Sequence, residues 1–323
     1  MAARRPWFAR ICGALLVSVP LATTAASADP LAVIAAVKGR VEVTSARGGP
    51  AVRASFGRTL ERGDRIAVPA GGAATVFFND GNVVELAEKS AMTIGGRAAP
   101  ARKAGAAPGL PGEVYANVSK FVTGGSRETG LVALSSLRGG DSSPLILEPR
   151  KTELLDGRPT FRWRALEGAT RYRVAVSGEQ GELWNREVED TALEYPADAA
   201  PLTAGGDFLW EVRAFSAQGE SRREESYVHV LTPEEAAGVR GSLVRIHESA
   251  GGVGSPAACF LSGSYLFGRG LYRDAVGQFE ALSQLSPESP SAHEALGNVY
   301  RAVGLMDLAA AEYQRALTLS REP

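Results

Sequence analysis

The sequence is poor in the side chains from which most catalytic and metal sites are built. Among 323 residues there are two cysteines and three histidines, and His229, His247 and His293 are not clustered. A zinc site needs several such ligands close together. The glycine-rich motifs that bind dinucleotides or phosphates are absent, as are H-E-x-x-H, C-x-x-C and G-x-S-x-G. We therefore expect no catalytic residue, no cofactor and no metal, and a protein that is not an enzyme.

Long apolar runs are missing as well. The run at residues 11–21 is shorter than the roughly 20 residues that span a bilayer, and no later stretch approaches that length. It follows three arginines and precedes Ala26-Ser27-Ala28, the order typical of a cleaved secretory signal peptide. We expect residues 1–28 to be removed on export. The expected product is a periplasmic protein that begins at Asp29 and has no stable membrane span.

The chain also lacks an excess of charge of either sign. It has 35 Lys and Arg against 36 Asp and Glu, and loss of the three arginines in residues 1–28 changes the net charge from −1 to −4. Such a balance gives no reason to expect nucleic acid as a partner. Cys12 leaves with the signal peptide, so Cys259 has no partner for an intrachain disulfide and is expected to be a small core residue.

Residues 29–138 contain short alternating strands. The segments 73–78 and 83–86 alternate on either side of Asn79-Asp80-Gly81-Asn82, and Asp-Gly supplies the positive φ that a tight hairpin turn needs. This turn lacks the ligand spacing of a calcium loop, so a plain hairpin is favoured. Residues 95–112 predict a loop rich in Gly, Ala and Pro. Helical spacing at 113–123 predicts a short amphipathic helix.

The run from Gly57 to Ile94 resembles the FecR-type periplasmic domain. The matching features are Leu60, Gly63-Asp64, Ile66, Asp80-Gly81, Leu86 and Ile94. The resemblance implies an all-β periplasmic domain that contacts other envelope components. Members that regulate iron uptake signal to a sigma factor through a cytoplasmic segment and a transmembrane helix. We find neither here, so we do not expect that role.

A linker at 139–146 precedes a second β region at 147–231. Alternating strands are predicted at 161–164, 171–176 and 208–214, separated by turn residues, as in a β-sandwich. The placement of Trp163, Tyr172 and Trp210 resembles a fibronectin type III module. The arginines beside these rings are read as the solvated face of amphipathic strands, with an anionic glycan as the alternative partner.

Residues 232–323 predict helices. Thr232, Pro233 and Glu235 give a strong helix start, and the chain then matches itself at a spacing of 34 residues. Ser255-Pro256 recurs as Ser289-Pro290, Gly263 as Gly297, Gly270-Leu271 as Gly304-Leu305, Ala275 as Ala309 and Phe279 as Tyr313. The pattern resembles two tetratricopeptide repeats, which implies paired helices that bind a protein segment on a concave face.

That resemblance places five candidate partner-binding residues on the first helix of each repeat. They are Phe260, Phe267, Glu294, Asn298 and Arg301. Large aromatic side chains often dominate the energy of such surfaces. The alternative is that both phenylalanines are core residues packed against the helix at 233–248. On the first interpretation, residues 232–323 would bind a partner by themselves.

Together these features predict a multidomain fold: a FecR-like all-β domain, a fibronectin type III-like sandwich, then an all-α helical repeat region. We expect an exported, non-enzymatic adaptor or scaffold whose repeats and β domains bind periplasmic or envelope proteins. The alternative is a cell-envelope protein that binds peptidoglycan or polysaccharide. An enzyme with a site of no known motif is a third hypothesis.

Overall fold

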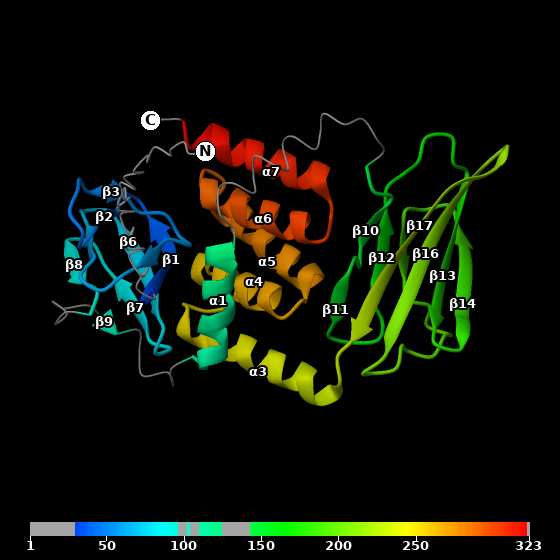
Figure 1. The fold of residues 1–323 in the computed structure, drawn as a ribbon, viewed down its shortest axis with the longest axis horizontal. Helices are drawn as coiled ribbons and strands as arrows, with labels where there is room; N and C mark the ends of the chain where they lie inside the picture. The colour runs from blue at the N-terminus through cyan, green and yellow to red at the C-terminus, as the bar shows by residue number, and fades with distance from the viewer. Residues whose placement is uncertain (1–29, 96–101, 104–109, 125–142, 322–323) are drawn as a thin grey trace, which may run out of the picture.

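The computed structural model of the chain describes residues 30–95, 102–103, 110–124 and 143–321. The expected signal peptide at 1–28 lies outside them, as does most of the 95–112 loop. A β unit, a layer of helices and a second β unit follow one another along the molecule (Figure 1). The helical layer comes last in the sequence but lies between the two β units and contacts both. Among the described residues, no helix has the length and apolar character needed to cross a membrane.

The N-terminal β unit consists of two antiparallel sheets. Its strands are β1 (Ala32–Lys38), β2 (Glu42–Thr44), β3 (Val52–Arg53), β4 (Thr59–Leu60), β5 (Arg65–Val68), β6 (Ala73–Phe78), β7 (Val83–Leu86), β8 (Ser90–Thr93) and β9 (Arg102–Lys103). One sheet has the order β4-β1-β6-β7-β9 and the other β3-β2-β5-β8. The predicted hairpin is confirmed, because β6 pairs with β7 and Gly81 takes a φ of +84° in the turn.

Helix α1 (Gly112–Gly124) confirms the amphipathic helix predicted after the loop. Its buried side chains include Val114, Val118 and Phe121. The Tyr115 ring contacts Phe77, and its hydroxyl donates to the Pro30 carbonyl at 2.6 Å, which fixes α1 to the β unit. The same helix packs along α4 (Pro256–Gly268), so α1 joins the β unit to the helical layer.

The second β unit is a sandwich of two sheets, ordered β10-β12-β15 and β11-β17-β16-β13-β14. Its strands are β10 (Ile146–Glu148), β11 (Thr152–Leu154), β12 (Thr160–Trp163), β13 (Arg171–Gly178), β14 (Gly181–Val188), β15 (Ala192–Glu194), β16 (Asp207–Ser216) and β17 (Gly219–Val230). The three predicted strands are confirmed as β12, β13 and β16. Phe161, Trp163, Tyr172 and Trp210 form the core, each at most 3% exposed.

The helical layer contains α3 (Pro233–Ser249), α4, α5 (Tyr272–Leu285), α6 (Pro290–Ala302) and α7 (Met306–Leu319). The predicted start of α3 is confirmed, because Thr232 and Glu235 form both bonds of a capping box. The other four helices form two hairpins, α4–α5 and α6–α7, with extensive contacts within each pair. The chain turns between paired helices at Gly270 and Gly304, which take similar positive φ values of +78° and +81°.

Each hairpin brings a glycine against an aromatic ring. A Cβ added at Gly263 would lie 2.8 Å from the Phe279 ring, and one added at Gly297 would lie 2.8 Å from the Tyr313 ring. Real Cβ atoms do not approach so closely, so both positions require glycine for the paired helices to reach this separation. The predicted 34-residue periodicity therefore corresponds to a repeated packing contact in space.

Replacing Gly263 with alanine should destabilise the protein even though alanine favours helix. Overpacking against Phe279 costs about 1–3 kcal/mol, whereas the gain in helix propensity is about 1 kcal/mol at most. Gly277 is the matched control, because it is also helical and nothing lies within 4 Å of its added Cβ. Gly277→Ala should raise the urea midpoint and Gly263→Ala should lower it. Equal shifts in the same direction would contradict the packing explanation.

The N-terminal β unit and the helical layer share one hydrophobic core. A continuous cluster of buried side chains runs from β1 through α1 to α6, while the sandwich has a core of its own. The central helix α4 is buried on nearly every side, and all ten residues from 257 to 266 are buried. A helix that is apolar on all faces needs neighbours all round. The β unit, α1 and the paired helices supply them.

The sandwich docks on the helices through a side chain that caps α5. Leu271, the residue before α5, makes no side-chain cap bond. Thr152 of β11 takes that role from another part of the chain. Its hydroxyl accepts from the Tyr272 amide at 2.9 Å and lies 3.1 Å from the Gly270 carbonyl, while the Glu153 amide donates to the same carbonyl at 3.0 Å.

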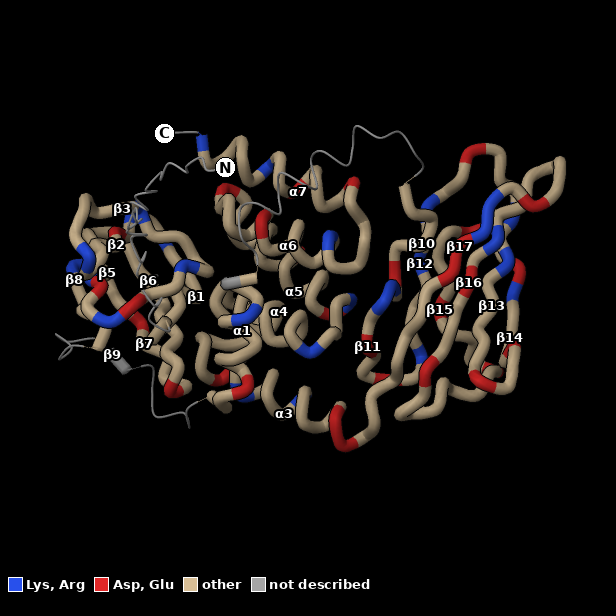
Figure 2. Tube along the Cα trace, viewed as in Figure 1, with Lys and Arg blue, Asp and Glu red and all other residues tan. Residues whose placement is uncertain are grey.

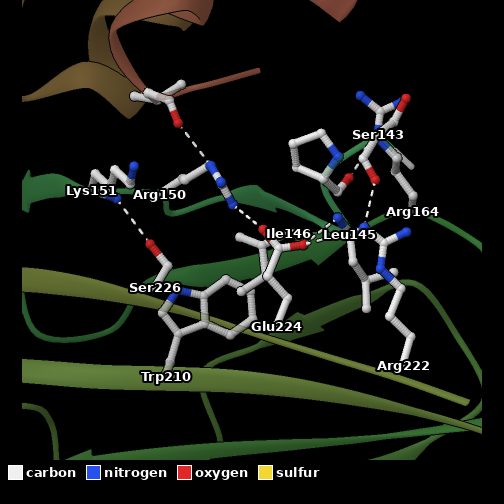
Figure 3. A network of polar contacts seen from close by, with 12 residues as sticks. Ser143, Leu145, Ile146, Arg150, Lys151, Arg164, Trp210, Arg222, Glu224 and Ser226 are labelled. Atoms are coloured by element: carbon white, nitrogen blue, oxygen red, sulfur yellow. Dashed lines mark hydrogen bonds and ion pairs between the residues drawn. The ribbon is translucent and has the colours of Figure 1, made fainter. Parts of the chain in front are cut away.

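A second set of polar contacts docks the sandwich on the α6–α7 turn. The Arg150 guanidinium donates to the Val303 carbonyl at 2.7 Å and also pairs with Glu224 of β17 (Figure 3). Glu224 in turn accepts from the Leu145 and Ile146 amides. Both helical hairpins are thus held at their turns by residues 150–153 of the sandwich, at and just before β11.

Thr152→Val should weaken the docking of the sandwich without disturbing either core. Valine keeps the shape of threonine but leaves the partly buried Tyr272 amide without this acceptor, which costs about 1 kcal/mol. Thr152→Ser is the control, because serine retains the hydroxyl. Amide hydrogen exchange should show faster exchange at the start of α5 in the valine variant only. Unchanged protection there would show that the cap does not matter.

Candidate functional site

Phe260, one of the five predicted partner-binding residues, lies in the core. It is 2% exposed, and its ring centroid lies 5.5 Å from that of Phe56 in the N-terminal β unit. The same ring lies 3.7 Å from the position of a Cβ added at Gly57. The alternative of a core residue therefore holds. The packing partner differs from the one expected, because the β unit rather than the helix at 233–248 makes these ring contacts.

Phe267 is partly buried and is also covered by the chain itself. Its ring packs against Phe121 of α1, with centroids 4.9 Å apart, and against Tyr272 at 5.3 Å. The expectation that both rings lie open on a concave surface is therefore wrong. Helix α1 and the β unit lie where a partner was expected to bind, because burying these rings within the chain removes a large apolar area from water.

Part of the surface on which partner binding was expected stays open as a cleft between α6 and the β unit. Its volume is about 430 Å³. The α6 wall carries Ser291, Glu294, Ala295 and Asn298, and the facing wall carries Val52, Arg53, Ser55, Arg58 and Thr59. Phe56, Phe121, Val122 and Phe260 also line it. We call this space the α6 cleft. It brings together three of the five predicted residues, Phe260, Glu294 and Asn298.

The other two predicted residues, Phe267 and Arg301, are not part of the cleft lining. Arg301 belongs to the same helix as Glu294 and Asn298. It lies one turn further along α6 and is partly buried. Asn298 is held in place by the Tyr313 hydroxyl, which donates to its Oδ1 at 2.8 Å. Glu294 is the most exposed of the three predicted residues of α6 and lies on the open wall.

The β-unit wall contributes cationic groups that the sequence analysis did not identify. Arg53 is exposed and Arg58 is partly exposed. Within the described part of the chain neither guanidinium has an ion pair or a hydrogen bond. By contrast, Arg47 and Arg40 in the same unit pair with Glu61 and Glu42. No sequence signal sets Arg53 and Arg58 apart, because their position opposite α6 arises only when the chain folds.

A second cleft, of about 560 Å³, lies between the sandwich and the helices. Burial raises the pKa of the Glu148 and Asp274 carboxyls that line it. Glu148 pairs with Arg162 at 3.0 Å, and Asp274 lies 3.8 Å from Arg273. Charges in this cleft are thus largely compensated by the chain, as expected of a joint between two parts of one protein.

The other candidate groups have structural surroundings. His293 lies 2.7 Å from Glu312, His229 lies 2.9 Å from Asp207, and His247 lies 3.4 Å from Ser262. Burial raises the pKa of the Cys259 thiol, which makes it a poor nucleophile. The described residues contain no group of three or more metal-ligating side chains. In the Asn79–Asn82 turn, Asp80 accepts from the Asn82 amide at 3.0 Å, an ordinary turn contact.

The arginines beside the sandwich rings are matched by acidic residues on other elements, and residues of both charges are found among the strands of the sandwich (Figure 2). Arg162 pairs with Glu148, Arg164 with Asp307, Arg171 with Glu187 and Arg173 with Glu182. Trp163 and Tyr172 point inward, at 2% and 3% exposure. This arrangement matches the amphipathic strands that the sequence favoured over a cationic binding surface.

Comparison with known proteins gives only distant structural likenesses. No known protein family matches the sequence. No curated protein matches it either. Among solved structures, an α-L-rhamnosidase from Dictyoglumus thermophilum matches at 19% identity and a TM-score of 0.24, over 30% of this chain and 14% of that one. A segment of two fibronectin type III domains from chicken tenascin matches at 10% identity and a TM-score of 0.20, over 59% and 83%. The FN1–FN3 domains of chicken CNTN1 match at 11% and 0.20, over 60% and 56%.

Proposed function

We propose that the protein is an exported, non-enzymatic adaptor of the cell envelope that binds another periplasmic or envelope protein in the α6 cleft. The observation that carries this proposal is the cleft itself. It combines an aromatic floor with polar groups on both walls, and three of the residues that sequence reasoning assigned to partner binding line it. Protein-binding surfaces combine apolar anchors with surrounding polar groups in this way.

The finer identity of each part belongs to the same proposal. The N-terminal β unit is FecR-like, the sandwich is fibronectin type III-like and the two helical hairpins are tetratricopeptide-like. The sequence motifs quoted above support these assignments, as do the hairpin at β6–β7 and the repeated glycine–aromatic contacts of the helices. Export through a signal peptide at 1–28 rests on the sequence alone.

The rigid joints between the parts favour a scaffold. A shared core fixes the β unit to the helices, and the Thr152 and Arg150 contacts fix the sandwich to the helical turns. A partner bound in the cleft would therefore be held in a set position relative to the sandwich. Binding of peptidoglycan or polysaccharide is the second candidate function, but the pairing of the sandwich arginines with acids makes an anionic glycan a poorer ligand for that face.

Site-specific photocrosslinking in living cells tests the proposal. A photoreactive residue at position 291, in the α6 cleft, should give an adduct with a distinct protein. The same residue at position 183, which is 51% exposed on the sandwich edge, should not give that adduct. Sedimentation of the purified protein with peptidoglycan tests the second candidate. Cosedimentation without any protein adduct from position 291 would overturn the adaptor in favour of a wall-binding protein.

A further inference from the structure

We propose that the α6 cleft takes an extended polypeptide segment that carries acidic side chains. The inference rests on the proposed function and specifies the chemistry of the partner at that site. Three observations in one cleft carry it. Two arginines have no acidic partner among the described residues, two sheet edges have no described strand paired to them, and aromatic rings lie beneath the cleft.

The two arginines provide the charge argument. Arg53 and Arg58 lie on one wall, and neither guanidinium has an acidic partner within the described residues. Most arginines of the sandwich are paired with Asp or Glu, as are Arg40 and Arg47 of the N-terminal β unit. Arg62 and Arg65 of that unit also lack an ion pair among the described residues, but they do not line the cleft. A guanidinium binds a carboxylate through charge-assisted hydrogen bonds, which are stronger than neutral ones.

The strand arrangement indicates that the ligand is extended. Among the described strands, β3 is an edge of its sheet and pairs with β2 alone, and β4 is one edge of the other sheet. The Ala54 amide donates to the Val41 carbonyl. Because antiparallel residues alternate between facing the partner strand and facing away, the amide and carbonyl of Arg53 point to the free edge. An exposed strand edge of this kind can pair with an added peptide strand.

The apolar residues of the cleft favour a ligand that also carries apolar side chains. Phe56 and Phe260 pack together beneath the cleft, and Val52 stands at its rim with 50% of its surface exposed. Successive side chains of an extended peptide point to opposite sides. A segment that alternates acidic and apolar residues would place its acids near Arg53 and Arg58 and its apolar groups against Val52 and the small exposed area of the two rings.

Binding of defined peptides by the exported chain, residues 29–323, tests the inference. The probe is a short, end-blocked fluorescent peptide that alternates glutamate and valine, with its glutamine and lysine counterparts as comparisons. Fluorescence anisotropy should show binding of the glutamate peptide, weaker binding of the glutamine peptide and none of the lysine peptide. Added salt should weaken binding, because partly exposed charge pairs are screened. Equal binding of all three peptides, or of none, would overturn the inference.

Charge reversal then locates the site. Arg53→Glu with Arg58→Glu should weaken binding of the glutamate peptide roughly 10-fold or more. The matched control is Lys38→Glu with Arg65→Glu, which changes the net charge equally in the same β unit but away from the cleft. An equal loss in both variants would show that only net charge acts and would overturn the proposed site.

Backbone pairing has a separate test. Arg53→Pro should bind more weakly than Arg53→Ala, because proline also removes the outward amide at a position where an edge strand tolerates it. Equal affinities would overturn the extended pairing. Failure of this inference can be told apart from failure of the proposed adaptor function. If the Arg53/Arg58 variant still gives a protein adduct from position 291, the adaptor function stands and the acidic ligand is rejected.

Discussion

Phe260→Ala should lower the free energy of unfolding by about 3–5 kcal/mol, the range for removal of a buried phenylalanine ring. The ring is 2% exposed and joins α4 to Phe56 of the β unit, so its loss opens a cavity at the joint of two parts. Urea unfolding followed by far-UV circular dichroism should show a clear fall in the midpoint. Because the β unit and the helices share this core, signals from both should shift together.

Leu285→Ala is the control for this experiment. Leu285 is a large apolar residue of α5 that is 49% exposed, so its truncation should change stability by no more than about 0.5 kcal/mol. If Phe260→Ala leaves stability and helix content unchanged, the ring lies on an open surface and the expectation from the repeat pattern was right. In that event the Phe260 ring does not pack against Phe56 in the folded protein.

Residues 232–323 produced alone should fail to form a stable, well-packed fold. The shortened chain loses α1 and β1, which cover α4, and it exposes Phe260, Phe267 and much of the surface around them. Exposed apolar surface of this kind binds hydrophobic dyes and promotes aggregation. We expect strong dye binding and a broad thermal transition, in contrast to the chain from 29 to 323.

Complementation provides the control for the shortened chain. Adding residues 29–124 in trans should restore a sharp transition and suppress dye binding, because this segment contains both the β unit and α1. Adding the sandwich segment, 143–231, should do so much less, since it contacts the helices mainly through polar groups at their turns. A shortened chain that is well folded and monomeric by itself would contradict the shared core.

Several local features could be predicted from the sequence because they depend on short-range contacts. The Asp80-Gly81 turn, the Thr232 capping box and the 34-residue helical repeat each involve residues close in the chain or equivalent by repetition. Their side-chain chemistry is sufficient to specify the local backbone. The same holds for the inward rings and outward arginines of the sandwich strands, since alternation follows from strand geometry.

The candidate site could be predicted only in part. Glu294 and Asn298 follow from their position on the first helix of a repeat, and they do line the α6 cleft. The exposure of Phe260 and Phe267 was predicted wrongly. The repeat pattern predicts that these rings face a groove, but it does not predict that α1 and the β unit of the same chain occupy that groove. Arg53 and Arg58 could not be identified, since only the folded chain places these two arginines together in the wall that faces α6.

The sequence by itself determined the elements of this protein: two β parts, paired helices with glycine–aromatic contacts, and few groups suited to catalysis. Only the tertiary structure decided how they combine. It placed the last segment of the chain between the two β parts, covered α4 with α1 and β1, and supplied the cap of α5 from Thr152. The physical reason is that apolar burial has no direction or sequence range, so any exposed apolar face of sufficient size can bury the α4 rings. Which face does so depends on the packing of the whole chain.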